Sequence, residues 1–89
     1  MSMDTKTLSG SDRLSLLGVA HAIKREAHLC GEMGRWFNDG MRLVARQVEG
    51  SALAGCAFSP KAIDESQGRM YAQGQRRALL ILEGAAIGR

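Results

Sequence analysis

The chain has 89 residues, of which 45% are hydrophobic, and a formal net charge of +3. A single domain of this length buries only about 60% of its unfolded surface, so its stability depends on efficient packing. Its two cysteines give no disulfide framework of the kind found in small secreted proteins, and no apolar run is long enough for a signal peptide or a transmembrane helix. We therefore expect a cytoplasmic protein without a membrane partner.

The first eleven residues differ in character from the rest of the chain. Residues 1–11 are polar and contain few apolar side chains, which predicts a flexible leader. Ser11 suits the N-cap of a following helix, and Asp12 lies favourably near the positive end of its dipole. A single helical domain over residues 12–89 is expected.

Residues 12–49 carry an apolar stripe with the spacing of an amphipathic helix. Its positions are separated alternately by four and three residues, and a polar stripe follows the same alternation on the opposite side. We call the apolar stripe the seam; it consists of Leu16, Ala20, Ile23, Ala27, Cys30, Gly34, Phe37, Met41, Val44 and Val48. Because the phase is kept throughout, the pattern favours one continuous helix that packs in the manner of a coiled coil.

Glycines are the main argument against continuity. Each glycine in a helix interior costs about 1 kcal/mol relative to alanine, and two of them, Gly31 and Gly34, lie close together. A hinge at residues 31–34 is therefore the alternative. An unbroken helix would be about 55 Å long, whereas a compact domain of this size is about 30 Å across. A continuous helix thus predicts an elongated hairpin or a core completed by other chains.

The second half of the chain predicts a shorter helix. Gly50 suits the end of the first helix, and residues 50–59 form a connector rich in small residues. Ser59 followed by Pro60 is a strong helix-start signal, so we expect a second helix over residues 60–85. A short connector favours antiparallel packing. The predicted fold class is all-α, a helical hairpin completed by homo-oligomerisation or by a partner protein.

The width of the apolar face indicates where a partner protein would bind. A second apolar stripe lies one residue before the seam and contains Leu29, Met33, Trp36, Gly40 and Leu43. Small seam residues permit close approach of another helix, whereas tryptophan often dominates protein interfaces. The candidate interface residues are Ala27, Gly34, Phe37 and Met41 for the helix contact, with Leu29 and Trp36 at the edge that faces the partner.

The charged residues allow an alternative function in nucleic-acid binding. Along the polar stripe, basic and acidic residues alternate at helical spacing, in the pairs Arg35 with Asp39, Asp39 with Arg42, and Arg46 with Glu49. Such pairs are typical of a solvated helix face. The second helix carries Arg69, Arg76 and Arg77, which suit phosphate contacts. A small DNA-binding regulator, with a helix-turn-helix over residues 51–82, is therefore the second hypothesis.

Catalytic and metal sites are disfavoured by spacing. His21 and His28 are seven residues apart, which places them about 10 Å apart along a helix, too far to share one metal ion. Cys30 lies on the seam, where a small buried side chain is expected. The sequence contains no phosphate-binding loop and no nucleophile motif. We therefore expect a non-catalytic protein that binds no cofactor and no metal.

One stretch of the second helix resembles known proteins. Residues 68–82, with the sequence GRMYAQGQRRALLIL, resemble the C-terminal helix of short helical proteins encoded by tailed bacteriophages and prophages, in which a Gly-x-Arg-Arg step often precedes an aliphatic run. The resemblance covers about fifteen residues and transfers no functional residue. It implies a virion component, or an accessory inhibitor or adaptor that binds a phage or host protein, located in the virion or the host cytoplasm.

Overall fold

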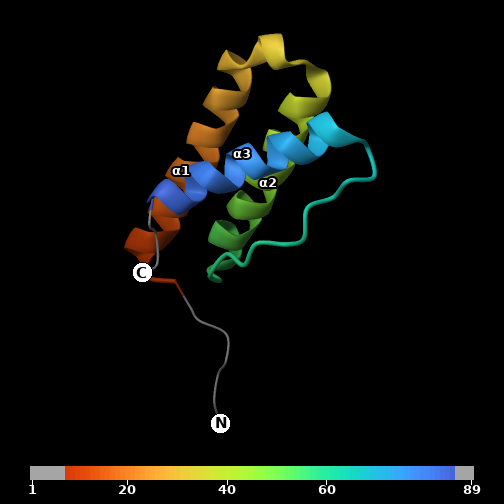
Figure 1. The fold of residues 1–89 in the computed structure, drawn as a ribbon. Coiled ribbons are helices and arrows are strands. Elements are labelled where there is room, and N and C mark those ends of the chain that lie inside the picture. The colour runs from red at the N-terminus through yellow and green to blue at the C-terminus, as the bar shows by residue number, and fades with distance from the viewer. Residues whose placement is uncertain (1–7, 86–89) are drawn as a thin grey trace.

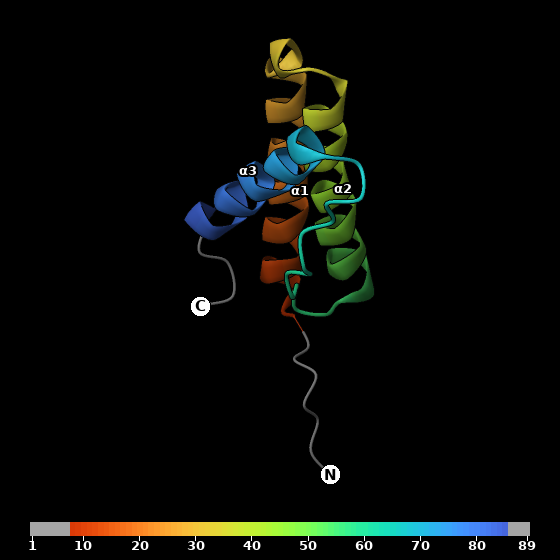
Figure 2. The same cartoon turned by 45° about the vertical axis from the view of Figure 1, so that its right-hand side comes forward.

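The structure, a computed structural model, describes residues 8–85 of the chain. Every regular element in this part is a helix: α1 (Gly10–Leu29), the short 3-10 helix η1 (Gly31–Met33), α2 (Arg35–Ala54) and α3 (Arg69–Ala85). α1 and α2 lie side by side as an antiparallel hairpin, and α3 crosses over it (Figure 1, Figure 2). The all-α class is confirmed, but the helix boundaries differ from the prediction.

The first helix begins earlier than the sequence suggests. Most of the predicted leader, residues 1–7, lies outside the described part of the chain. The N-cap is Ser9 rather than Ser11, because the Ser9 hydroxyl accepts a hydrogen bond from the backbone N–H of Asp12 at 3.0 Å. The backbone N–H of Leu8 donates to the carbonyl oxygen of Gly55 at 2.9 Å. This bond ties the start of α1 to the end of α2.

The expectation of one continuous helix over residues 12–49 is wrong. The chain turns back at residues 31–34, as the alternative predicted. Gly34 adopts φ 97° and ψ 165°, a conformation that is essentially restricted to glycine. α2 then begins at Arg35 and runs back along α1.

The seam nevertheless forms the core. Its members on α1 and α2 that are buried are Leu16, Ala20, Ile23, Ala27, Phe37, Met41, Val44 and Val48. The two halves of the seam face each other across the hairpin, so each covers the other. The described residues extend over 46 × 24 × 19 Å, well short of a 55 Å rod. The chain therefore hides its own seam, and the argument that other chains must cover it no longer holds.

The connector is longer and lies later than predicted. α2 continues through Gly50 to Ala54 and ends at Gly55, which adopts the left-handed φ of 75°. Residues 55–68 contain no helix and run back along the hairpin to the start of α3 (Figure 1). The helix start expected at Ser59 and Pro60 is therefore wrong.

Hydrogen bonds from α3 explain why the segment before it is not helical. The side chain of Gln75, which is buried, accepts a hydrogen bond from the backbone N–H of Asp64 at 2.8 Å and donates one to the Asp64 carbonyl oxygen at 2.7 Å. The Asp64 carboxylate in turn accepts a hydrogen bond from the backbone N–H of Ser66 at 2.9 Å. The Asp64–Ser66 bond is a local contact of the kind that competes with helical hydrogen bonds, and Gln75 occupies backbone groups of Asp64 that a helix would use. α3 begins only after Gly68.

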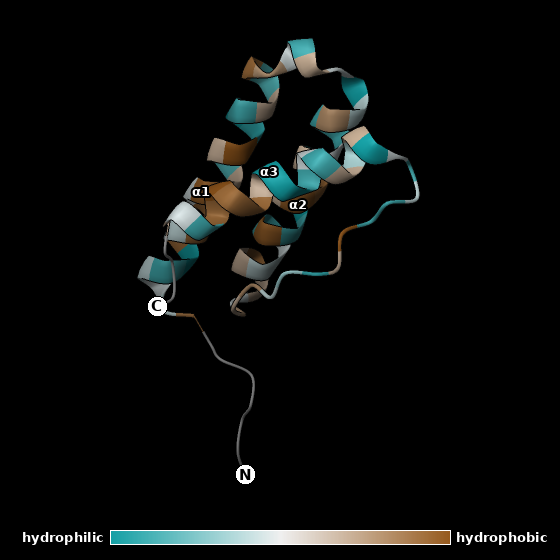
Figure 3. Ribbon diagram, in the orientation of Figure 1, coloured by the Kyte–Doolittle hydropathy of each residue, from teal (hydrophilic) through white to brown (hydrophobic). Residues whose placement is uncertain are grey.

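α3 crosses the hairpin instead of packing antiparallel to it (Figure 2). Its first half packs on α2, where Gly40 and Gly74 are both buried. Figure 3 shows that its apolar residues gather in its second half, near α1. There Leu79, Ile81 and Leu82 pack against the core, whereas Leu80 is exposed. α3 thus covers one open side of the hairpin.

Candidate functional site

The six candidate interface residues fall into two groups. Three of them are buried in the core that α1 and α2 form within the chain: Ala27, Phe37 and Met41. Leu29 and Trp36, by contrast, are 74% and 49% exposed. Gly34 is exposed in the turn, and a Cβ there would meet no atom within 4 Å, so it is not the predicted site of close helix approach. Of the expected helix-contact residues only Gly34 is exposed, and the large side chains at the surface are those of the expected partner-facing edge, Leu29 and Trp36.

The turn between α1 and α2 carries a group of exposed apolar side chains. We call residues 29–36 the hairpin tip. Within these eight positions Leu29, Met33 and Trp36 are all exposed. The guanidinium carbon of Arg35 lies 5.9 Å from the centroid of the Trp36 ring, a cation–π contact that restricts the indole. The hairpin tip therefore combines flexible and rigid apolar groups at one end of the molecule.

Backbone hydrogen bonds fix the conformation of the hairpin tip. The N–H of Met33 donates to the carbonyl oxygen of Cys30 at 2.9 Å, and the N–H of Gly34 donates to that of Gly31 at 3.2 Å. These bonds satisfy backbone groups that a turn would otherwise leave to solvent. A partner would therefore meet a largely preformed surface.

A hollow of about 330 Å³ lies beside the hairpin tip, where α1 and α2 run together. We call it the cationic hollow; it is lined by Lys24, Arg25, His28, Leu29 and Arg42. The Lys24 ammonium lies 3.4 Å from the carboxylate of Glu49 on α2. Within residues 8–85 neither arginine of the hollow forms an ion pair, and none of the lining side chains is a carboxylate.

A second group of charged residues joins α1 to α3. The Arg77 guanidinium donates a hydrogen bond to the Glu26 carboxylate at 2.8 Å, and the Cys30 thiol lies 3.7 Å from the same oxygen. This hydrogen bond lowers the pKa of Glu26, and the carboxylate raises the pKa of Arg77. Burial raises the pKa of the Cys30 thiol, and the neighbouring Glu26 charge adds to the rise. The raised pKa disfavours the Cys30 thiolate, which is the nucleophilic form of the side chain.

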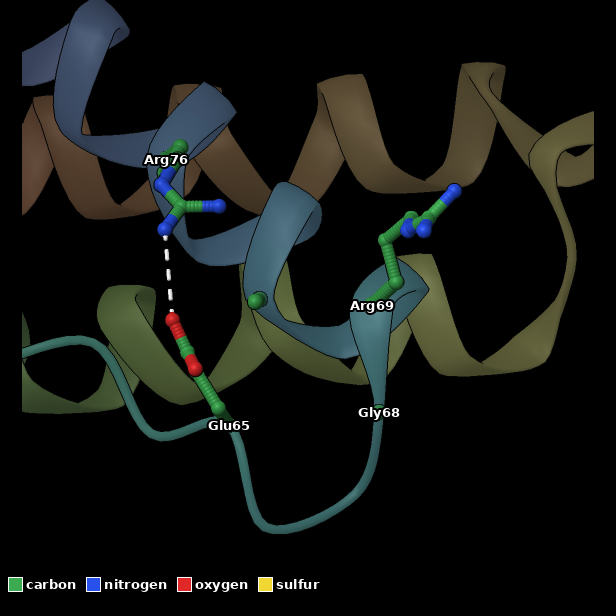
Figure 4. Close-up of a pocket in the computed structure, with 5 residues that line it drawn as sticks. Glu65, Gly68, Arg69 and Arg76 are labelled. Atoms are coloured by element: carbon green, nitrogen blue, oxygen red, sulfur yellow. Dashed lines mark hydrogen bonds and ion pairs between the residues drawn. The ribbon is translucent and has the colours of Figure 1, made fainter.

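The three arginines proposed for nucleic-acid contacts lie in two places: Arg69 and Arg76 line one hollow together with Glu65, whereas Arg77 faces α1. Arg76 lies 3.4 Å from the Glu65 carboxylate and Arg77 is bound by Glu26. Figure 4 shows that Arg69, at the start of α3, points away from the Glu65–Arg76 pair. Because residues 55–68 are not helical, the helix-turn-helix expected over residues 51–82 does not form.

The described residues contain no group of three His, Cys, Asp or Glu side chains placed to hold a metal ion. His21 and His28 are both exposed on α1. In the same part of the chain, none of the helices has the length and apolar character needed to cross a bilayer.

The cationic hollow is the feature that sequence reasoning missed. Arg42 was expected to pair with Asp39 one turn away, and Arg46 with Glu49, yet neither pair forms within the described residues. Glu49 instead reaches Lys24 on the neighbouring helix. The sequence shows that the polar stripe carries cations. Which of these cations come together depends on the turn at the hairpin tip, because the turn places the two helices side by side.

Comparison with protein-family models, with curated proteins and with solved structures finds no match for this chain.

Proposed function

We propose that the chain is a non-catalytic protein-binding protein that contacts its partner through the hairpin tip. The observation that supports this proposal is the exposure of Leu29, Met33 and Trp36 within eight residues. Large apolar side chains that stand together at a surface are typical of interaction sites, whereas single exposed ones are ordinary.

The structure of the core strengthens the proposal. The seam is already covered by the chain itself, so the exposed residues of the hairpin tip are not left over from an incomplete core. Trp36 lies beside Arg35, and tryptophan and arginine are the residue types most enriched at energetically dominant interface positions. The hairpin tip thus has the composition expected of an interface centre.

Two kinds of partner are compatible with this role. In an assembly, such as a phage virion, the partner would be another copy or another subunit. In an inhibitor or adaptor, the partner would be a different protein. The DNA-binding alternative has weaker support, because two of its three arginines, Arg76 and Arg77, are already engaged by carboxylates.

Alanine substitutions at matched exposed positions test the proposal. The test variant combines Leu29→Ala with Trp36→Ala, and the control combines Leu53→Ala with Leu80→Ala, whose side chains are similarly exposed outside the hairpin tip. Neither variant should change stability by more than about 0.5 kcal/mol, since exposed side chains contribute little to packing. Each protein is used to capture binding proteins from lysate of the cells that encode it, and its solution mass is measured by light scattering.

We expect the control variant to capture the same protein as the original chain, or to have the same oligomeric mass. The test variant should lose that captured protein or that oligomeric mass. The emission of Trp36, the single tryptophan, should also shift to shorter wavelength when the partner is added. If both variants retain the same partners and the same mass, the hairpin tip is not the binding surface.

A further inference from the structure

The cationic hollow has an electrostatic imbalance that the ion pairs within residues 8–85 correct only at Lys24. Lys24 is balanced by Glu49, but Arg25 and Arg42 approach from different helices with no carboxylate in the lining. Like charges that share a hollow repel one another. An anionic group that entered between the two guanidinium groups would relieve this repulsion.

The nature of that anionic group follows from the remaining wall. Leu29 lines the hollow and also belongs to the hairpin tip. A ligand that fills the hollow therefore meets cations and an exposed aliphatic side chain together. Guanidinium groups bind carboxylates through paired hydrogen bonds, and an apolar side chain next to the carboxylate in the ligand would cover Leu29. A bare anion would leave Leu29 in water.

We propose that the partner at the hairpin tip is a protein with an acidic, amphipathic segment, whose carboxylates enter the cationic hollow while its apolar side chains cover Leu29. This inference rests on the proposed function and adds the chemistry of the partner. A second copy of the chain fits less well, because two copies that each carry a net charge of +3 repel one another. A single-stranded nucleic acid fits less well, because its phosphates would leave Leu29 uncovered and no Phe, Tyr or Trp side chain lines the hollow to stack on a base.

The experiment is a selection from a displayed library of random peptides against the whole chain. The selected peptides are synthesised, and their affinities are measured for the original chain and for two variants. The first variant is expected to bind the peptides more weakly, and the second is expected to bind them like the original chain. The first variant combines Arg25→Glu with Arg42→Glu in the hollow. The second is Arg69→Glu, which reverses a charge on α3 outside the hollow. Circular dichroism of each variant verifies that the helices are retained.

We expect the selected peptides to be enriched in Asp and Glu next to apolar residues. The double variant should bind them at least about tenfold more weakly, since two favourable charge contacts become repulsive, and Arg69→Glu should bind them within about twofold of the original chain. Replacing each acidic residue of a peptide by its amide should also weaken binding, but less than the double variant does, because an amide removes the attraction without adding repulsion.

Three results would overturn the inference, and they separate it from the proposed function. The selected peptides could lack acidic enrichment and depend on Leu29 and Trp36 but not on the two arginines of the hollow. That result would support the hairpin tip as a binding surface and exclude the acidic partner. Acidic peptides that bind the double variant as tightly as the original chain would reject the hollow as their site. An oligonucleotide that competes with the peptides and loses affinity in the double variant would assign the hollow to phosphate instead.

Discussion

Gly40 of α2 and Gly74 of α3 lie against each other's helix backbone where the two helices cross. A Cβ atom on Gly40 would overlap the carbonyl oxygen of Tyr71, and one on Gly74 would overlap the carbonyl oxygen of Phe37. Both obstacles are backbone atoms, so they cannot be relieved by rotating a side chain. The separation of α2 and α3 therefore depends on the absence of side chains at these two positions.

Gly40→Ala is expected to destabilise the fold. The added methyl group forces α2 and α3 apart, and overpacking of this kind typically costs about 1–3 kcal/mol. That cost opposes the gain of about 1 kcal/mol that alanine brings to a helix interior. The measurement is the free energy of unfolding in urea, followed by circular dichroism.

Gly50→Ala is the matched control, because Gly50 lies in the same helix and a Cβ there would meet no atom within 4 Å. It should stabilise the protein by up to about 1 kcal/mol. Equal effects of the two substitutions would show that the crossing of α2 and α3 is looser than described.

Gln75→Ala is expected to release the connector from α3. The substitution removes the two hydrogen bonds to the backbone of Asp64 and the bond from the Gln75 amide to the Tyr71 carbonyl oxygen. Because Asp64 is exposed, water can replace its lost partners, so we expect a loss of about 1 kcal/mol for each hydrogen bond removed and faster tryptic cleavage after the exposed Lys61. Limited proteolysis followed by mass spectrometry measures the cleavage rate.

The neighbouring exposed residue Gln73 supplies the comparison, since Gln73→Ala removes no bond of the connector. Cleavage at Lys61 that is equally fast in both variants, or unchanged in Gln75→Ala, would contradict a connector held by Gln75.

The buried side of the hairpin and the place of a possible break could be predicted from the sequence, but the choice between a straight helix and a turn could not. Seam residues such as Ile23 and Met41 are buried because helical spacing selects them whether the helix is straight or folded back. The phase of the seam on the two sides of Gly34 is the same in a continuous helix and in this hairpin. Phase alone therefore could not distinguish a continuous helix from a hairpin. The backbone conformation of Gly34, which is specific to glycine, distinguishes the two.

The start of α3 shows the limit of local signals. Ser59 and Pro60 form a good helix start by composition, yet the helix begins at Arg69. The deciding interaction comes from Gln75, which binds the backbone of Asp64 eleven residues earlier. Tertiary hydrogen bonds of this kind override a capping preference worth about 1 kcal/mol.

The candidate site was likewise predictable only in part. Leu29 and Trp36 were identified because they extend the apolar face beyond one helix width, and both are exposed. The cationic hollow needs residues of two helices, such as Arg25 and Arg42. Their proximity follows from the turn, which the spacing of the seam did not reveal.

The ion pair between Glu26 and Arg77 predicts a dependence of stability on pH. The hydrogen bond from Arg77 lowers the pKa of Glu26 in the folded protein below that in the unfolded chain. The stabilisation is therefore fully present above the unfolded pKa and is lost as the pH falls through the folded pKa. Asp64, whose pKa is lowered by its hydrogen bonds with Ser66, acts in the same direction.

We expect the urea concentration at the unfolding midpoint to decrease as the pH is lowered from neutral to about pH 3. The decrease should be smaller in Glu26→Gln. Glu83→Gln is the control, because Glu83 is exposed and forms no ion pair within residues 8–85. A Glu26→Gln variant whose midpoint falls as steeply as that of the original chain would show that this pair contributes nothing to acid sensitivity.

Gly34→Ala is expected to disturb the turn of the hairpin. The φ of 97° and ψ of 165° at Gly34 lie in a region that costs about 1–3 kcal/mol for other residues. Gly31→Ala is the matched control in the same turn, because Gly31 has no positive φ and a Cβ there would meet no atom within 4 Å. Unfolding in urea should therefore separate the two variants by at least about 1 kcal/mol.

The same substitution should also promote exchange of helices between copies. Since the seam keeps its heptad phase on both sides of residues 31–34, opening the hairpin produces one long helix with a continuous apolar stripe, and a second opened copy can cover that stripe. Strain at Gly34 penalises the closed turn but not the opened form, so Gly34→Ala should contain more dimer than Gly31→Ala at equal concentration. Light scattering over a range of concentrations measures the dimer fraction. Equal stability and equal mass in the two variants would mean that the backbone of Gly34 does not hold the hairpin closed.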